Sequence, residues 1–341
     1  MSSHRGRHSA GRGYMPLPGL IAVHVLCIAV GLLVFAYFHH VRDYLTPAPS
    51  PPVSLYTPAP LTTPTPAAAN ETASGENTPQ PTTEPVSRGM FGDKFPGKFT
   101  GGEVIRTENS YMSEHINVTL TRIEKTGLVC HVAEIYITDT KYLRTAFGEK
   151  GYGYRGMAAD LAAANNAIVA ISGDYFAARK EGVVIRNGVL YRETRFEDIC
   201  ALLSDGRMLT LPAQGYDLEE LKSTAPWQVW SFGPMLLENG EAKTEFNSTV
   251  VRKNPRAAIG CVEPGHYFFV QVDGRGAFSS QGLTLGELAS LFEELGCTTA
   301  YNLDGGQTAG MVWNGELVSY PYGRSVSDII YIAELPEEEE D

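Results

Sequence analysis

The chain has 341 residues, which suits one large domain or two small ones, and a formal net charge of −12. This acidic balance disfavours nucleic acid as a partner, because the phosphate backbone is also anionic. Part of the acidity is a terminal run at 337–341 that is typical of a solvated tail.

The N-terminal 38 residues have the pattern of a membrane anchor. Residues 1–16 carry Arg5, Arg7 and Arg12 and no acidic residue, and 17–38 carries no formal charge. As a helix, that stretch would span roughly 30 Å of hydrocarbon. A cleaved signal peptide would have a shorter apolar core and a small-residue exit site, which this stretch lacks. We expect an uncleaved transmembrane helix with a cytoplasmic N-terminus and an extracytoplasmic C-terminal domain.

Residues 39–89 are predicted to form a linker. Eleven of the chain's 21 prolines lie within 46–87, among many Thr, Ser and Ala residues. Such a segment cannot bury a core and favours polyproline II. We expect it to separate the anchor from one folded domain at 90–335, which the acidic tail at 336–341 follows.

The predicted domain is rich in strands. Apolar runs flank four Asn-Gly or Asp-Gly pairs that favour type I′ hairpin turns, at 187–188, 205–206, 239–240 and 314–315. Helices are expected at 157–166 and 284–295. The second has leucines at helical spacing, and Thr284 with Glu287 would form its capping box. The pattern predicts an α+β fold, a sheet-rich mixed domain with several hairpins and few helices.

Four of the five cysteines lie outside the predicted anchor, and none forms a C-x-x-C pair. Cys130, Cys200, Cys261 and Cys297 could form two disulfides in any of three connectivities, or remain free and buried.

Three carboxylates follow apolar runs, where a sheet would hold their backbone. They are Asp174, Asp273 and Asp304. If the strands before Asp273 and Asp304 are neighbours, both carboxylates open onto one edge of the sheet, near Arg275. Carboxylates beside arginines suit a phosphorylated sugar, because guanidinium groups bind phosphate oxygens and a carboxylate acts at the anomeric carbon. Taken singly, an Asp-Gly pair at a strand end more often only forms a turn.

Taken in order, the motifs of the second half of the chain resemble the phosphodiester glycosidase family. They are AISGDYF, GVVIRNGVLYR, SFGPMLLENG, NPRAAIG, VQVDGRG, SQGLTLGELASLFEELGC, AYNLDGGQTAGMVWNG and RSVSDIIYI. Together they span about 165–332. Two positions depart from the usual family pattern: Ser172 replaces an Asn, and Gln307-Thr308 replaces a Gly-Ser pair.

The resemblance implies hydrolysis of a sugar-1-phosphodiester, with a phosphorylated glycan or cell-envelope polysaccharide as substrate. The sequence shows no His/Cys spacing typical of metal ligands, so we expect no cofactor and no metal. The resemblance gives the catalytic roles to Asp174, Asp273 and Asp304. The expected substrate-binding residues are Arg256, Arg275, Asn302, Gly305, Gly306, Thr308 and Arg324. Two alternatives stay open: a metal-dependent phosphodiesterase that cuts the P–O bond, and a tethered polysaccharide-binding module without turnover.

Overall fold

The computed structural model describes residues 17–36, 53–54, 89–148 and 150–335. The chain divides into two compact units, 1–48 and 49–341, which are taken separately below. The predicted basic segment, the acidic tail and all of the predicted linker except 53–54 and 89 lie outside the described residues.

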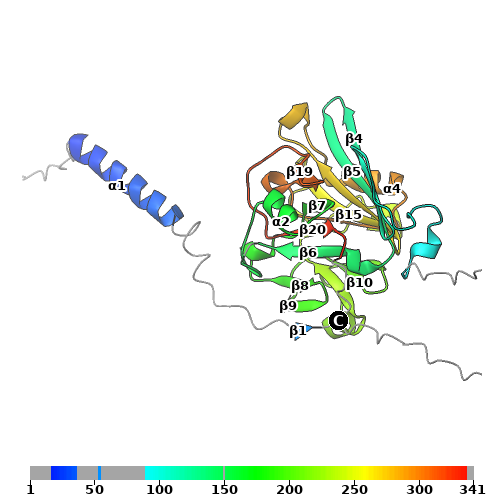
Figure 1. Ribbon diagram of the computed structural model, residues 1–341. Coiled ribbons are helices and arrows are strands. Elements are labelled where there is room, and N and C mark those ends of the chain that lie inside the picture. Colours follow the sequence, from blue (N-terminus) through cyan, green and yellow to red (C-terminus); the bar gives the residue numbers. More distant parts are fainter. Residues whose placement is uncertain (1–16, 37–52, 55–88, 149, 336–341) are drawn as a thin grey trace, which may run out of the picture. The chain divides into compact units, whose positions relative to one another are not determined.

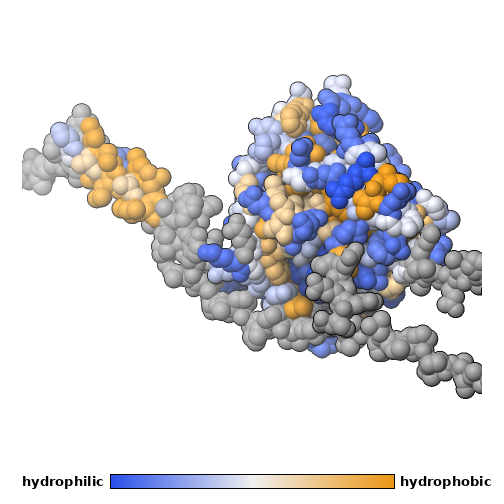
Figure 2. Space-filling view, in the orientation of Figure 1, coloured by the Kyte–Doolittle hydropathy of each residue, from blue (hydrophilic) through white to orange (hydrophobic). Residues whose placement is uncertain are grey.

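In the first unit, helix α1 (Leu17–Ala36) forms within the predicted membrane span. Most of its visible surface is hydrophobic (Figure 2). Within the part of the chain that the structure describes, however, no helix meets the combined length and apolarity needed to cross a membrane. The prediction of a transmembrane anchor therefore gains no support from the structure.

The second unit is built from antiparallel sheets (Figure 1), which confirms the predicted sheet-rich mixed fold. A seven-stranded sheet has the order β17 (Thr299–Asn302), β15 (Arg256–Glu263), β16 (His266–Val272), β5 (Leu128–Ile137), β4 (Ile116–Lys125), β3 (Ser110–Met112), β2 (Ile105–Arg106). A five-stranded sheet has the order β19 (Glu316–Leu317), β18 (Met311–Trp313), β7 (Val169–Ser172), β20 (Asp328–Ile332), β6 (Leu143–Phe147).

A six-stranded sheet completes the core of the fold. Its order is β1 (Val53–Ser54), β9 (Val189–Thr194), β8 (Gly182–Arg186), β12 (Pro226–Trp230), β10 (Ile199–Leu203), β11 (Met208–Leu211). A two-stranded ribbon pairs β13 (Leu237–Glu238) with β14 (Glu241–Ala242). One hydrophobic cluster joins the three large sheets, with Ile135, Ile171 and Trp230 fully buried among its members. Burial of apolar surface between the sheets thus holds them together as one domain.

The four predicted hairpins are confirmed. The turns join β8 to β9, β10 to β11, β13 to β14 and β18 to β19. Three of the turn asparagines, Asn187, Asn239 and Asn314, have a positive φ of 47–54°. Each glycine that follows also has a positive φ, as the type I′ geometry requires. The turn at 205–206 departs from the predicted type I′, because Asp205 does not have a positive φ.

The described part of this unit contains three α-helices: α2 (Ala158–Ala164), α3 (Leu218–Ser223) and α4 (Leu285–Glu294). The first and last confirm the predicted helices, shortened at their ends. Thr284 and Glu287 form the predicted capping box of α4. The buried face of α4, with Leu288 and Phe292, packs in one cluster with Phe268 of β16 and Ala300 of β17.

Strands β16 and β17 place the two predicted carboxylates at one edge of the sheet. This placement was predicted from the sequence on the condition that the two strands are neighbours. They are not, because β15 lies between them and pairs antiparallel with both. In the register, Arg256 is opposite Val272, and Ala258 is opposite Asn302. The C-terminal ends of β16 and β17 therefore lie on either side of Arg256, the first residue of β15.

Four cysteines of this unit, Cys130, Cys200, Cys261 and Cys297, are buried free thiols. Burial raises their pKa values, to about 12 for Cys130 and Cys261. The sequence left open whether these cysteines form two disulfides or remain free, and in the structure they are free.

Candidate active site

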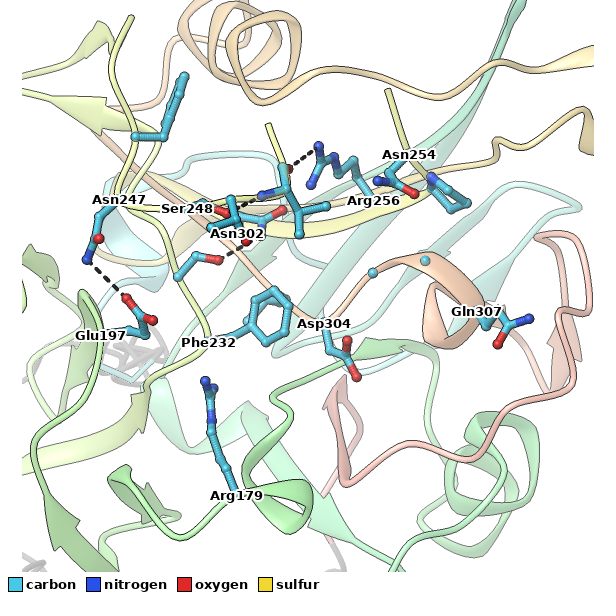
Figure 3. Close-up of a pocket in the computed structure, with 18 of the residues that line it drawn as sticks. Arg179, Glu197, Phe232, Asn247, Ser248, Asn254, Arg256, Asn302, Asp304 and Gln307 are labelled. Carbon is cyan, nitrogen blue, oxygen red and sulfur yellow. Dashed lines mark hydrogen bonds between the residues drawn. The ribbon is translucent and has the colours of Figure 1, made fainter. Parts of the chain in front are cut away.

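A cavity of about 660 Å³ opens at this sheet edge (Figure 3). Seven predicted site residues line it: Arg256, Arg275, Asn302, Asp304, Gly305, Gly306 and Arg324. They come from the start of β15, from the last residue of β17 and the segment after it, from the segment after β16, and from the segment before β20. Three predicted residues, Asp174, Asp273 and Thr308, do not line it.

Asp304 is the predicted carboxylate that faces the cavity. Its backbone N–H donates to the carbonyl of Gly173 over 2.9 Å, which ties the seven-stranded sheet to the end of β7. The side chain is 8% exposed, and its Oδ2 is buried without a hydrogen-bond partner among the described residues. Burial raises the pKa of Asp304 to about 7, against the opposing effects of the Thr308 hydroxyl and the Arg324 charge. A carboxyl with this pKa can exchange a proton at neutral pH.

Arg256 carries a buried charge without a carboxylate partner. The side chain is 4% exposed, and it donates to the backbone carbonyls of Leu283, Val250 and Arg252. No ion pair to Arg256 forms among the described residues. Burial lowers its pKa to about 10. Because a buried charge is stable only when it is compensated, this wall of the cavity favours an anion.

Two further arginines stand at the same cavity without a carboxylate partner. Arg275 donates through Nε and Nη2 to Oδ1 of Asn254, at 3.3 and 3.1 Å. Arg324 donates to the hydroxyl of Tyr175 over 3.2 Å. Neither forms an ion pair within the described part of the chain. In an acidic protein, the cavity therefore gathers positive charge.

The remaining predicted binding residues have different surroundings. Asn302 donates from Nδ2 to the carbonyl of Gly233, and its Oδ1 is a buried acceptor without a partner among the described residues. Gly305 packs so closely on the β15 segment that a Cβ there would lie 2.6 Å from the carbonyl oxygen of Pro255. The N–H of Gly306 donates to that same oxygen, and the Thr308 hydroxyl donates to the carbonyl of Gly305. These contacts give Gly305 and Thr308 structural roles, and the N–H of Gly306 is already engaged.

Asp174 is fully buried behind the cavity wall. Its Oδ1 accepts from Arg179 and from the N–H of Tyr175, and its Oδ2 accepts from Arg186 and from the N–H of Ser231. The two arginines, followed by the two N–H groups, lower its pKa despite burial. Its carboxylate is stably ionised and fully hydrogen-bonded.

Asp273 is likewise fully buried and lies outside the cavity lining. Its Oδ1 accepts from the side chain of Gln271 and from the N–H of Tyr320, each over 3.0 Å. The N–H of the next residue, Gly274, donates to the hydroxyl of Tyr322 over 2.8 Å. Asp273 thus joins the turn that carries Arg275 to the segment that carries Arg324.

The cavity lining also includes residues that the sequence analysis did not predict, among them Arg179, Glu197, Phe232 and Asn247 (Figure 3). Asn247 donates to Oε2 of Glu197 over 3.0 Å. Burial raises the pKa of Glu197, although Arg179 acts in the opposite direction. Of these four residues, only Phe232, in the SFGP segment, belonged to a motif that the sequence analysis had recognised. Within the described residues, no three His, Cys, Asp or Glu side chains gather closely enough to hold a metal ion.

Comparison with known proteins agrees with the site. Residues 165–333 match the family model of the phosphodiester glycosidases. The chain's second half contains a domain of the phosphodiester glycosidase family. This assignment confirms the resemblance that the motifs indicated over nearly the same residues.

The curated relatives share only part of their length with this chain. The SPbeta prophage-derived protein YomE of Bacillus subtilis is 28% identical over 169 residues, which are 47% of this chain and 26% of that protein. The N-acetylglucosamine-1-phosphodiester alpha-N-acetylglucosaminidase of Bos taurus is 34% identical over 84 residues, which are 25% of this chain and 16% of that protein.

Two solved structures share the fold. The catalytic domain of the zebrafish N-acetylglucosamine-1-phosphodiester alpha-N-acetylglucosaminidase, auto-inhibited by its pro-peptide, has a TM-score of 0.54 and 21% identity. The match covers 70% of this chain and 86% of that one. A protein from Synechocystis has a TM-score of 0.52 and 15% identity, over 68% of this chain and 64% of that one.

Proposed function

We propose that this phosphodiester glycosidase domain hydrolyses the bond between the anomeric carbon of a sugar and an oxygen of a phosphodiester. One observation carries the proposal. Two groups face the same cavity: Asp304, a buried carboxyl with a pKa of about 7, and Arg256, a buried arginine without an acidic partner among the described residues. The first group suits chemistry at an anomeric carbon, and the second suits a phosphate.

In the proposed reaction, water supplies the hydroxyl group that the sugar gains. The C–O bond breaks, and its electron pair leaves with the phosphate monoester. A phosphate monoester is a stable leaving group, with a second pKa near 6, so it needs little general-acid assistance. Asp304 supplies the carboxylate that acts at the anomeric carbon, and Arg256, Arg275 and Arg324 bind the phosphate oxygens.

The bond that breaks can be identified with isotopic water. We expect the full chain to release sugar from methyl esters of hexose 1-phosphates, with N-acetylglucosamine 1-(methyl phosphate) among the panel. In ¹⁸O water, label should enter the sugar hydroxyl and be absent from methyl phosphate, and activity should persist in chelator. Label in the phosphate together with loss of activity in chelator would identify a metal-dependent phosphodiesterase. Binding without any product would identify a carbohydrate-binding module.

We further propose that the domain acts outside the cytoplasm, on a phosphorylated glycan of the cell envelope or an exopolysaccharide. The support comes from the sequence alone: the arginines at 5, 7 and 12 precede the uncharged stretch 17–38, and a proline-rich segment follows. Protease added to intact cells should release the folded domain by cutting within 46–87. A domain that stays protected until the cells are lysed would contradict this location.

A further inference from the structure

Arg179 is held rigidly at the wall of the cavity. Its Nη2 donates to Oδ1 of Asp174 over 3.1 Å and to the carbonyl of Ser231 over 2.9 Å. The centre of the guanidinium lies 4.7 Å from the ring of Phe196 and 5.8 Å from the ring of Phe232. Two hydrogen bonds and two aromatic rings thus define the plane of the guanidinium.

Two nitrogens of the guanidinium, the buried Nε and Nη1, are without a hydrogen-bond partner among the described residues. Figure 3 shows Arg179 pointing into the cavity beside Phe232, on the side opposite Arg256. Glu197 and Asp304 line the same cavity, and the Arg179 charge lowers the pKa of each. An arginine donor is therefore presented between the two carboxylates.

Among the described residues, the carboxylate of Asp174 accepts hydrogen bonds from one residue that lines the cavity, Arg179. Asp174 is fully buried, and both of its oxygens accept two hydrogen bonds. Arg186 also pairs with Asp328, whose Oδ1 accepts from the N–H of Asp174. The network therefore contains two arginines and two aspartates. Its charges are balanced, and it leaves no room for a substrate at Asp174.

We propose that Arg179 binds the sugar half of the substrate and that Asp174 is a positioning residue that holds Arg179. This inference rests on the proposed function and adds a specificity-determining residue to it. The charge of Arg179 is offset by Asp174, whereas the charge of Arg256 has no such partner among the described residues, so the phosphate goes to the Arg256 side. Arg179 then donates to a sugar oxygen beside the face of Phe232. Asp174 contributes to sugar binding by holding Arg179 in place.

The two products of hydrolysis test the two halves of the cavity separately. In Arg179→Gln, competitive inhibition by the released free sugar should weaken by about 10- to 100-fold, the effect of losing a hydrogen bond from a charged donor. Inhibition by methyl phosphate should change by less than about twofold, within the scatter of independent sites. Arg179→Lys should restore part of the sugar inhibition. Arg122→Gln, at an exposed arginine of β4, is the matched control and should change neither.

A double-mutant cycle tests the link to Asp174. If Asp174 acts through Arg179, the free sugar should inhibit the double variant Asp174→Asn/Arg179→Gln to the same extent as it inhibits Arg179→Gln alone. The ascending limb of the pH profile of kcat/KM should also move to higher pH in Arg179→Gln, because a charge that lowers the pKa of Asp304 and Glu197 is gone. If Asp174→Asn fails to fold, the single variants of Arg179 and this pH shift still test whether Arg179 binds the sugar.

Equal weakening of inhibition by both products would overturn the inference, and so would additive effects in the cycle. If the wild type releases no sugar at all, it is the proposed function that fails. The contact is then tested by binding: N-acetylglucosamine should raise the Tm of the wild type and not that of Arg179→Gln, and an equal rise in both would contradict it.

Discussion

Replacing Asp304 with Asn should lower kcat by about 10²–10⁴-fold, the usual contribution of a general acid or base. The substitution keeps the size of the side chain and removes only its ionisable carboxyl. In the wild type, kcat/KM should rise with pH through about 7, where Asp304 becomes ionised. The variant should lose this limb of the profile. The measurements are kcat and the pH dependence of kcat/KM on the same phosphodiester.

Stability separates this role from a structural one. The folded state holds the Asp304 proton up to about pH 7, whereas the ordinary pKa is 3.8. The free energy of unfolding should therefore fall as pH rises between these values, because the folded state binds more protons there than the unfolded chain. Asp304→Asn removes this cost, so its Tm at pH 8 should equal or exceed that of the wild type.

The matched control is Asp205→Asn, in the exposed turn between β10 and β11. Asp205 accepts from the N–H and the side chain of Arg207, and its loss should cost less than about 1 kcal/mol. Turnover should be unchanged. A loss of kcat within tenfold at Asp304, or an equal loss at Asp205, would show that Asp304 is not catalytic.

Replacing Arg256 with Gln should weaken inhibition by methyl phosphate by about 10²-fold or more, the effect of removing one partner of a buried, hydrogen-bonded charge pair. KM for the phosphodiester should rise with it. The reason is that Arg256 is the cavity arginine whose charge is both buried and unpaired among the described residues. Methyl phosphate should also raise the Tm of the wild type and leave that of the variant unchanged.

Because Arg256 also holds the carbonyls of Val250, Arg252 and Leu283, the variant can lose local order. Arg256→Lys keeps the charge without the planar fork, so it should recover part of the phosphate binding. Arg122→Gln, at an exposed arginine, should leave inhibition unchanged. A phosphate-dependent rise in Tm that persists in Arg256→Gln would place the phosphate elsewhere.

The local elements could be predicted from the sequence because their signals are local. An Asn-Gly pair allows the positive φ of a type I′ turn, and Thr284 and Glu287 cap α4 through bonds within one turn of helix. The motifs of the second half of the chain also identified the family and seven residues of the cavity.

The sequence by itself thus determined the hairpins, the capped helix, the family and the strand ends that carry the site. Only the tertiary structure decided which of three similar carboxylates faces the cavity. Asp174 and Asp273 also follow buried strands, but they are enclosed by groups that include Ser231 and Tyr320, which lie 57 and 47 residues away in the chain. Burial and charge compensation depend on such distant contacts, so the exposure, pKa and partners of a carboxylate cannot be read from its neighbours in sequence.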